Sequence, residues 1–295
     1  RLTAARALVD QRMSDSHAEE TEVVDLMHLG HPQVIGAWRI GDVVIDPGPS
    51  SCLERLLPVL ERHPPRVIAL THIHLDHAGA TGTLLRRFPD AEVWVHEIGA
   101  HHLADPSRLL ASATRLYGEH MDLLWGEVAP VPVERIRELR GGETIGAFRV
   151  AYTPGHASHH VSYLHESSGR AFTGDVAGVR IGAGPVFAPT PPPDIDLEAW
   201  RDSIEQIEAW QPQSLAFTHF GSSDDVAGHL AALRGRLDQL ESMASGLDEE
   251  GFAAAVRAEL ALSTAETAAT YAQAMPPDQS FHGLARYMRV REANG

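Results

Sequence analysis

The sequence is poor in cysteine, has no lysine and contains no long apolar run. Cys52 is its single cysteine, so no disulfide can form within the chain, and nothing indicates a disulfide-stabilised secreted scaffold. All 24 basic residues are arginines, which excludes Schiff-base catalysis by a lysine. No segment approaches the roughly 20 apolar residues that a membrane helix needs. Residues 1–12 lack the apolar region of a signal peptide, so we expect a cytoplasmic protein.

Positive charge is also scarce. The chain has 40 acidic residues against 24 basic ones, and its formal net charge is -16. Such a surface repels phosphate backbones and anionic membranes, so we expect neither nucleic acid nor a membrane as a partner. A small-molecule substrate is the partner that this composition favours, and a homo-oligomer is compatible with it.

The order of apolar patterns predicts an α/β protein with a helical C-terminus. Short β-branched runs alternate with helical patterns in the first part of the chain, and only helical patterns follow. We predict an α/β domain over residues 13–223 and a helical module over residues 224–295. A helical insert at about residues 105–126 either forms one wall of a substrate pocket or packs on a sheet. Residues 1–12 precede Met13, a candidate native start, and are left out of the prediction.

The densest group of metal-ligating residue types lies directly after an apolar run at residues 67–70. His72, His74, Asp76 and His77 fall within six residues. In an extended segment, side chains two residues apart point the same way, so His72 and His74 can bind one ion. The chain then turns, and the adjacent Asp76 and His77 can face a second ion. Imidazole and carboxylate groups are ordinary zinc ligands.

Three further ligand types stand in similar settings later in the chain. His156, Asp175 and His219 each come shortly after an apolar run of the kind that forms a buried strand. Ligand sites in α/β sheets gather at the carboxyl ends of strands. We therefore expect one edge of the sheet to collect all seven side chains.

In order and spacing, these motifs resemble those of the metallo-β-lactamase superfamily. The matching residues are His72-x-His74-x-Asp76-His77, Thr153-Pro154-Gly155-His156, Gly174-Asp175 and His219. The resemblance covers roughly residues 23–223. It implies an α/β fold with a four-layer αβ/βα sandwich, followed here by the C-terminal helical module. It also implies two divalent metal ions, for which zinc is favoured, although iron and manganese accept the same ligands.

The resemblance assigns the ligands to two ions. It implies one ion bound by His72, His74 and His156, and a second bound by Asp76, His77 and His219. Asp175 would bridge the two ions.

The resemblance also implies roles beside the ligands. Asp46 would lie next to the metals and orient their ligands by hydrogen bonds. His160 is a further candidate for a position beside them.

A dinuclear centre implies a hydrolytic mechanism. Two close dications lower the pKa of a shared water molecule and give hydroxide near neutral pH. We expect a hydrolase in which a metal-bridging hydroxide attacks a small ester-like substrate, either a thioester or a lactone. Asp76 is the expected catalytic residue, because it is placed to orient the hydroxide and to pass a proton to the leaving group.

The later ligands distinguish between branches of the superfamily. Class B β-lactamases do not use a bridging aspartate at the position of Asp175, which disfavours a β-lactam substrate. The pattern resembles the glyoxalase II (hydroxyacylglutathione hydrolase) branch, which has a C-terminal helical domain, and also the lactonases and the nucleases. Basic and tyrosine side chains bind glutathione in glyoxalase II, and the candidates here are Arg286, Tyr287, Arg289 and Arg291.

Two alternative functions stay open at this point. A phosphodiesterase or nuclease of the same fold is disfavoured by the net charge of -16. A mononuclear or diiron redox enzyme, such as a protein similar to persulfide dioxygenases, would hold iron with some of these ligands. Flavin-linked diiron relatives have a carboxylate at the position of His74, so this histidine argues against that branch.

A few other polar side chains are candidates for smaller roles. His229 and His282, in the helical module, could reach the pocket. Tyr117 could donate to a substrate oxygen, although packing is its simpler interpretation. Ser222 and Ser223 are predicted to cap the helix that follows them.

Overall fold

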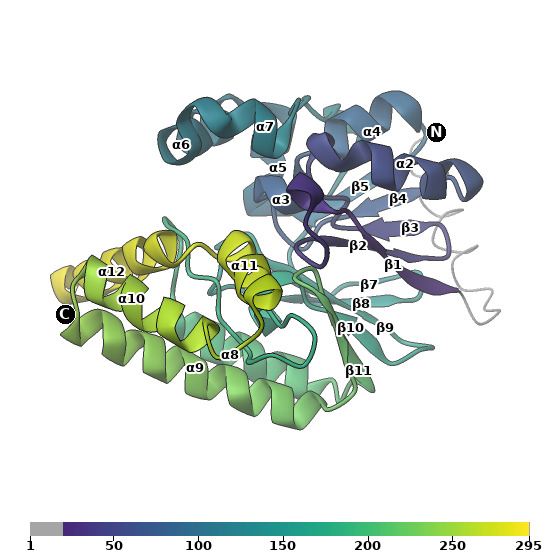
Figure 1. Cartoon of the computed structure of the whole chain (residues 1–295). Coiled ribbons are helices and arrows are strands. Elements are labelled where there is room, and N and C mark those ends of the chain that lie inside the picture. Colours follow the sequence, from purple (N-terminus) through teal and green to yellow (C-terminus); the bar gives the residue numbers. More distant parts are fainter. Residues whose placement is uncertain (1–19, 295) are drawn as a thin grey trace.

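Two six-stranded sheets form the centre of the protein, and helices cover their outer faces (Figure 1). The structure is a computed structural model that describes residues 20–294. The predicted domain start at residue 13 and the segment 1–12 lie outside the described residues. Among residues 20–294, no helix has both the length and the apolar character needed to cross a membrane.

The first sheet follows the order of the chain, β1-β2-β3-β4-β5-β6. Its strands are β1 (Thr21–Asp25), β2 (Gly36–Ile40), β3 (Val43–Ile45), β4 (Val67–Ala69), β5 (Glu92–His96) and β6 (Ile136–Leu139). The pairs β3·β4, β4·β5 and β5·β6 are parallel, whereas β1·β2 and β2·β3 are antiparallel. The carboxyl ends of β3 to β6 therefore lie at the same edge.

The second sheet has the order β12-β11-β10-β9-β8-β7. Its strands are β7 (Thr144–Ile145), β8 (Phe148–Tyr152), β9 (Val161–His165), β10 (Arg170–Phe172), β11 (Ser214–Phe217) and β12 (Gly221–Ser223). The pair β10·β11 is parallel, and the other pairs are antiparallel.

One prediction about helix capping is wrong, because the residues concerned form the strand β12. Ser222 and Ser223 do not cap the next helix, because they pair with β11 as part of β12. The cap is Asp225, whose side chain accepts a hydrogen bond from the backbone N–H of Gly228. The chain has to complete this short hairpin before the helix can begin.

Successive side chains along each strand face opposite sides of the sheet, and this alternation produces the layers. In β3, Val43 and Ile45 face the core between the sheets, whereas Val44 faces the helices on the outside. From the second sheet, Phe148 and Tyr163 enter the same central core. The predicted four-layer sandwich is confirmed: helix, sheet, sheet, helix.

Helices on the outside of the first sheet occupy the part of the chain before residue 126. They are α2 (Leu53–Arg62), α3 (Leu75–Ala78), α4 (Thr81–Arg87), α5 (Glu97–Ala104), α6 (Ser107–Tyr117) and α7 (Met121–Trp125). The predicted helical insert is thus a pair of short helices, α6 and α7.

Helices after residue 196 cover the second sheet. They are α8 (Leu197–Ala209), α9 (Val226–Gly246), α10 (Glu249–Leu260), α11 (Ala265–Ala274) and α12 (Pro277–Asn294). Leu233, Tyr271 and Leu284 from these helices share one hydrophobic cluster with Leu215 and Phe217 of β11. The C-terminal helices therefore pack on the sheet that precedes them, and the division of the chain at residue 224 stays a prediction.

Candidate metal centre

The seven predicted ligands meet at one edge of the sheets. His72 follows β4, Asp76 and His77 lie on α3, and the last three ligands follow the carboxyl ends of β8, β10 and β11. Within three groups, the ligand atoms lie within 4.8 Å of one another: His72 with His74 and His156, His72 with His77 and Asp175, and Asp76 with His77 and His219. The structure therefore brings all seven side chains together.

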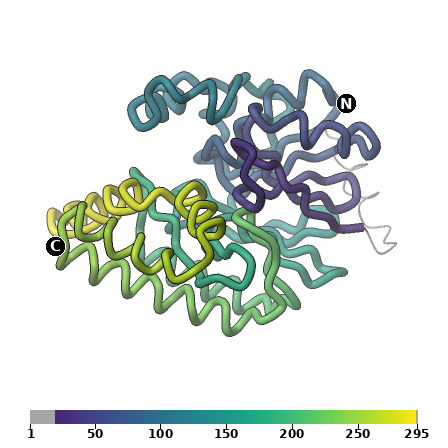
Figure 2. The backbone as a smooth tube through the Cα atoms, viewed as in Figure 1, coloured from purple at the N-terminus to yellow at the C-terminus, as the bar shows by residue number. Residues whose placement is uncertain are grey.

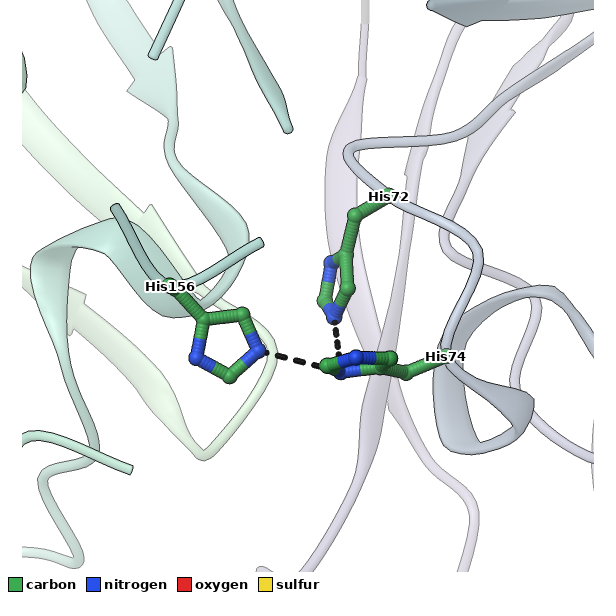
Figure 3. Close-up of side chains that lie close together, drawn as sticks. All are labelled: His72, His74 and His156. Atoms are coloured by element: carbon green, nitrogen blue, oxygen red, sulfur yellow. Dashed lines mark hydrogen bonds between the residues drawn. The ribbon is translucent and has the colours of Figure 1, made fainter. Parts of the chain in front are cut away.

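The first group consists of three imidazole rings. Nδ1 of His74 lies 3.0 Å from Nε2 of His72 and 3.0 Å from Nε2 of His156. Figure 3 shows the rings of His72 and His156 directed at the ring of His74 from separate parts of the chain. Three converging imidazole nitrogens are a donor set that suits zinc.

Asp175 lies between His156 on one side and the pair His77 and His219 on the other. Its Oδ2 is 3.4 Å from Nε2 of His156, and its Oδ1 is 3.3 Å from Nε2 of His77 and 3.6 Å from Nε2 of His219. Oδ2 of Asp76 lies 3.3 Å from Nε2 of His219 and completes the group of Asp76, His77 and His219. The Asp175 carboxylate thus presents one oxygen to each group, as a bridging ligand must.

Backbone carbonyls determine which ring nitrogen of two histidines carries the proton. Nδ1 of His156 lies 2.9 Å from the carbonyl oxygen of Pro189, and Nδ1 of His219 lies 2.5 Å from that of Val34. A carbonyl oxygen can only accept, so each Nδ1 donates and each neutral ring keeps its lone pair on Nε2. Both lone pairs are therefore directed into the centre.

Asp46 orients two more histidines in the same way. Its Oδ2 accepts from Nδ1 of His77 at 2.8 Å and from the hydroxyl of Thr71 at 2.6 Å. Because that hydroxyl donates to Asp46, it accepts from Nδ1 of His72, 3.1 Å away. Nε2 of both rings is left to face the centre, which is the role that partners of metal-binding histidines perform.

Burial and neighbouring charges determine the protonation of these side chains. Burial lowers the pKa of His72 well below its usual value and lowers that of His74 to about 4, so both rings are neutral. Burial alone would also lower the pKa of His77, but the carboxylates of Asp175 and Asp76 raise it. Burial would raise the pKa of Asp175, but His77 and the other nearby histidines hold it well below its usual value. The carboxylates are therefore anionic, which favours a cation beside them.

The centre contains buried polar atoms that hydrogen bonds do not satisfy. Among the described residues, Nε2 of His77, Nε2 of His219 and Oδ1 of Asp175 are buried and have no hydrogen-bond partner. Leaving such an atom unpaired costs roughly 1–3 kcal/mol. A bound divalent cation would satisfy all three, and the donor types fit zinc, iron or manganese.

Comparison with protein families decides the classification. The model of the metallo-beta-lactamase superfamily matches residues 41–219, which include Asp46 and all seven predicted ligands. The chain belongs to this superfamily. The fold of the superfamily binds divalent metals, and its members are mostly metal-dependent hydrolases.

Individual relatives agree with the classification. A metallo-beta-lactamase fold-containing protein of Sulfurisphaera tokodaii is 32% identical over 161 residues, which are 52% of this chain and 60% of that protein. A hydroxyacylglutathione hydrolase of Synechococcus is 26% identical over 207 residues, 68% of this chain and 69% of that enzyme. In the first of these matches the chain spans less than two thirds of its relative.

The fold is also found in a crystal structure of an archaeal metallo-beta-lactamase superfamily protein from Sulfolobus tokodaii. The TM-score is 0.67 at 22% identity, and the match covers 91% of this chain and 99% of that one. At this identity the likeness shows a common fold.

A cavity of about 350 Å³ opens beside the metallo-β-lactamase centre. His74, Asp76, His156 and Asp175 form part of its lining, and prolines of the loop at residues 182–193 form another part. Its other walls come from α6 and α7 on one side and from α11 and the start of α12 on the other (Figure 1). The insert thus forms a wall of the pocket, one of the two roles considered for it.

His28 is a pocket residue that the sequence analysis did not single out. Its Nε2 donates to the carbonyl oxygen of Leu124 at 2.9 Å, and its Nδ1 accepts from the Gln273 amide at 3.0 Å. Its ring stacks on Trp125, with centroids 5.6 Å apart. Figure 2 shows the purple N-terminal segment close to the C-terminal helices. Leu124 and Gln273 are 96 and 245 residues away from His28 in sequence, so no local pattern could reveal these contacts.

The other histidine candidates lie at different distances from the centre. His160 stacks on His72 with ring centroids 5.1 Å apart, and its Nδ1 lies 3.0 Å from the hydroxyl of Thr153. His229 is buried elsewhere against Phe217, and His282 is exposed. His160 is therefore beside the ligands, whereas His229 and His282 do not line the pocket.

The side chains suggested for glutathione recognition do not line the pocket either. Arg286 is exposed and donates to the carbonyl oxygen of Pro193 at 2.9 Å. Arg291 forms an ion pair with Glu241 at 2.9 Å, Arg289 is exposed, and Tyr287 is buried in the core. None of these four side chains is among the residues that line the cavity, although Pro193, which Arg286 contacts, is one of them.

Proposed function

We propose that this chain is a dinuclear metal-dependent hydrolase of small ester-like substrates, either thioesters or lactones. The observation that carries the proposal is the position of Asp175, whose two carboxylate oxygens face two different groups of ligands. A bridging carboxylate holds two cations close together. Such a pair lowers the pKa of water and polarises a carbonyl oxygen, which is the chemistry that hydrolysis of an acyl bond needs.

The chain's own residues would bind the ions and position the attacking water. His72, His74 and His156 would hold one ion, and Asp76, His77 and His219 the other. Asp76 also lines the cavity, and its side chain is 23% exposed, whereas that of Asp175 is 4% exposed. We assign to Asp76 the orientation of the attacking water and the transfer of a proton to the leaving group.

Overall, water is added across the acyl–sulfur or acyl–oxygen bond. The products are a carboxylic acid and a thiol or, from a lactone, a hydroxy acid. No oxidant or nucleophilic side chain is required. Cys52 is not among the residues that line the cavity, and burial raises the pKa of its thiol.

The experiment is a hydrolysis screen combined with metal analysis. The purified chain is tested against thioesters, lactones and phosphodiesters, and its metal content is measured in the same samples. We expect two zinc ions per chain and turnover of a thioester or a lactone. Iron together with oxygen consumption would favour the redox alternative, and turnover confined to phosphodiesters would favour the nuclease alternative.

Substitution of the bridging residue tests the dinuclear site directly. Asp175→Asn removes the negative charge between the two groups, so we expect metal content to fall below two ions per chain. We also expect kcat/KM to fall by at least about 100-fold. Asp90→Asn is the matched control, because Asp90 is fully exposed and precedes β5, whereas the predicted ligands follow the carboxyl ends of strands. Unchanged turnover and metal content in Asp175→Asn would contradict the proposal.

A further inference from the structure

The pocket beside the metal centre has no cationic side chain. Among residues 20–294, its lining contains histidines and the carboxylates Asp76 and Asp175 but no arginine, and the whole sequence has no lysine. His74, Asp76, His156 and Asp175 line one part of the cavity, so the reacting carbonyl would be held next to these residues. The rest of a bound substrate must therefore lie against the other walls.

Those walls are mainly apolar. The insert contributes Leu109, Ala113 and Trp125, and the connection between α11 and α12 contributes Met275. The few polar groups are uncharged, and one of them is already engaged: the hydroxyl of Tyr117 donates to the side-chain oxygen of Gln279 at 3.4 Å. A negatively charged group placed there would lose its water without gaining a counter-ion, which is strongly unfavourable.

We propose that this pocket takes an uncharged, largely apolar acyl compound and discriminates against glutathione thioesters. The inference rests on the proposed function for its chemistry, but the preference for uncharged substrates follows from the residues of the pocket walls alone. Glutathione brings two carboxylates, and the cavity offers them no arginine. The volume of about 350 Å³ suits a small molecule. The net charge of -16 acts in the same direction, because it repels anions as they approach.

The test compares two thioesters that carry the same octanoyl group. One is a thioester of glutathione, and the other is a thioester of the neutral thiol N-acetylcysteamine. With the zinc-loaded full chain, we expect kcat/KM for the neutral compound to exceed that for the glutathione compound by on the order of 100-fold. Equal or faster hydrolysis of the glutathione thioester would overturn the inference.

A direct binding measurement separates this inference from the proposed function. If neither thioester is hydrolysed, the proposed thioesterase chemistry fails, and binding of both compounds is then measured by calorimetry. Tighter binding of the neutral compound supports the inference even without turnover. Equal binding, or tighter binding of the glutathione compound, overturns it.

A cation introduced into the wall should reverse part of the preference. Gln279→Arg places a positive charge at the lining, so we expect kcat/KM for the glutathione thioester to rise about ten-fold relative to the neutral one. Ser112→Arg on α6 repeats the test from the opposite wall if the first variant does not fold. Leu123→Arg is the control, because Leu123 is 62% exposed on α7 and does not line the pocket. An unchanged ratio in folded Gln279→Arg and Ser112→Arg would contradict the inference.

Discussion

At the residue scale, Asp46 connects the backbone of the fold to the proposed ligands. Its Oδ1 accepts from the backbone N–H of Thr71, and its Oδ2 accepts from Thr71, His77 and the hydroxyl of Thr218. Its backbone has a φ of 48°, in the left-handed region that aspartate and asparagine tolerate better than most residues. One buried carboxylate thus holds three segments of the chain around the centre.

Asp46→Asn tests this role with little change in shape. Asparagine tolerates the same backbone conformation, but its NH2 group, in the place of Oδ2, cannot accept the hydrogen bonds that Oδ2 accepts. We expect the affinity for metal to fall by about 10–100-fold, and the free energy of unfolding to fall by roughly 1–3 kcal/mol. Metal titration and chemical denaturation measure the two effects. Wild-type metal affinity in a folded Asp46→Asn variant would show that Asp46 does not orient the ligands.

The ligands could be predicted from the sequence because their residue types and their spacing form recognisable local patterns. His72, His74, Asp76 and His77 form one short motif, and each later ligand follows a recognisable strand. The position of His28 in the pocket could not be predicted, because it depends on contacts with Leu124 and Gln273 from distant segments.

At the scale of secondary-structure elements, strand ends and the loops after them position the ligands. The loop between β8 and β9 carries His156, and Gly155 precedes it with a φ of 128°. A Cβ atom at Gly155 would lie 2.4 Å from Cα of Trp200 on α8. The backbone N–H of Asp196 also donates to the carbonyl oxygen of Gly155 at 2.9 Å. The loop is therefore held directly against α8.

Gly155→Ala should push this loop away from α8. We expect a loss of about 1–3 kcal/mol in the free energy of unfolding from overpacking, together with weaker metal binding through the displaced His156. Gly142→Ala is the matched control: Gly142 also has a positive φ, 94°, but a Cβ atom there would meet nothing within 4 Å. Thermal denaturation and metal titration of both variants measure the difference. Equal effects in the two variants would show that contact with α8 does not position His156.

Two strands, β6 and β12, have weak signals in the local sequence. β6 has the charged Arg137 and Glu138 at its centre and is a strand because β5 pairs with it. β12 consists of Gly221, Ser222 and Ser223, which favour turns and caps, and only pairing with β11 makes it a strand. Tertiary contacts outweigh local propensity in both cases.

At the scale of the whole molecule, the proposed metal ions would join the two halves of the sandwich. His72, His74, Asp76 and His77 come from segments after the first sheet's strands, and the other three ligands come from segments after the second sheet's strands. A cation that binds only the folded state stabilises it by about 2.7 kcal/mol at a concentration 100 times its dissociation constant.

Removal of metal should therefore destabilise the whole sandwich. We expect a chelator to lower the melting temperature by about 5–10 °C, because roughly 1 kcal/mol corresponds to about 2–4 °C in a protein of this size. Added zinc should restore the original value, as followed by differential scanning calorimetry. A melting temperature that does not change while the metal content falls to zero would show that the ions do not join the two halves.

The most direct test of the central claim is an anomalous difference map from crystals of the zinc-loaded protein. We expect two strong peaks on either side of the Asp175 carboxylate, one among His72, His74 and His156 and the other among Asp76, His77 and His219. A single peak, or zinc bound only away from these side chains, would contradict the dinuclear centre.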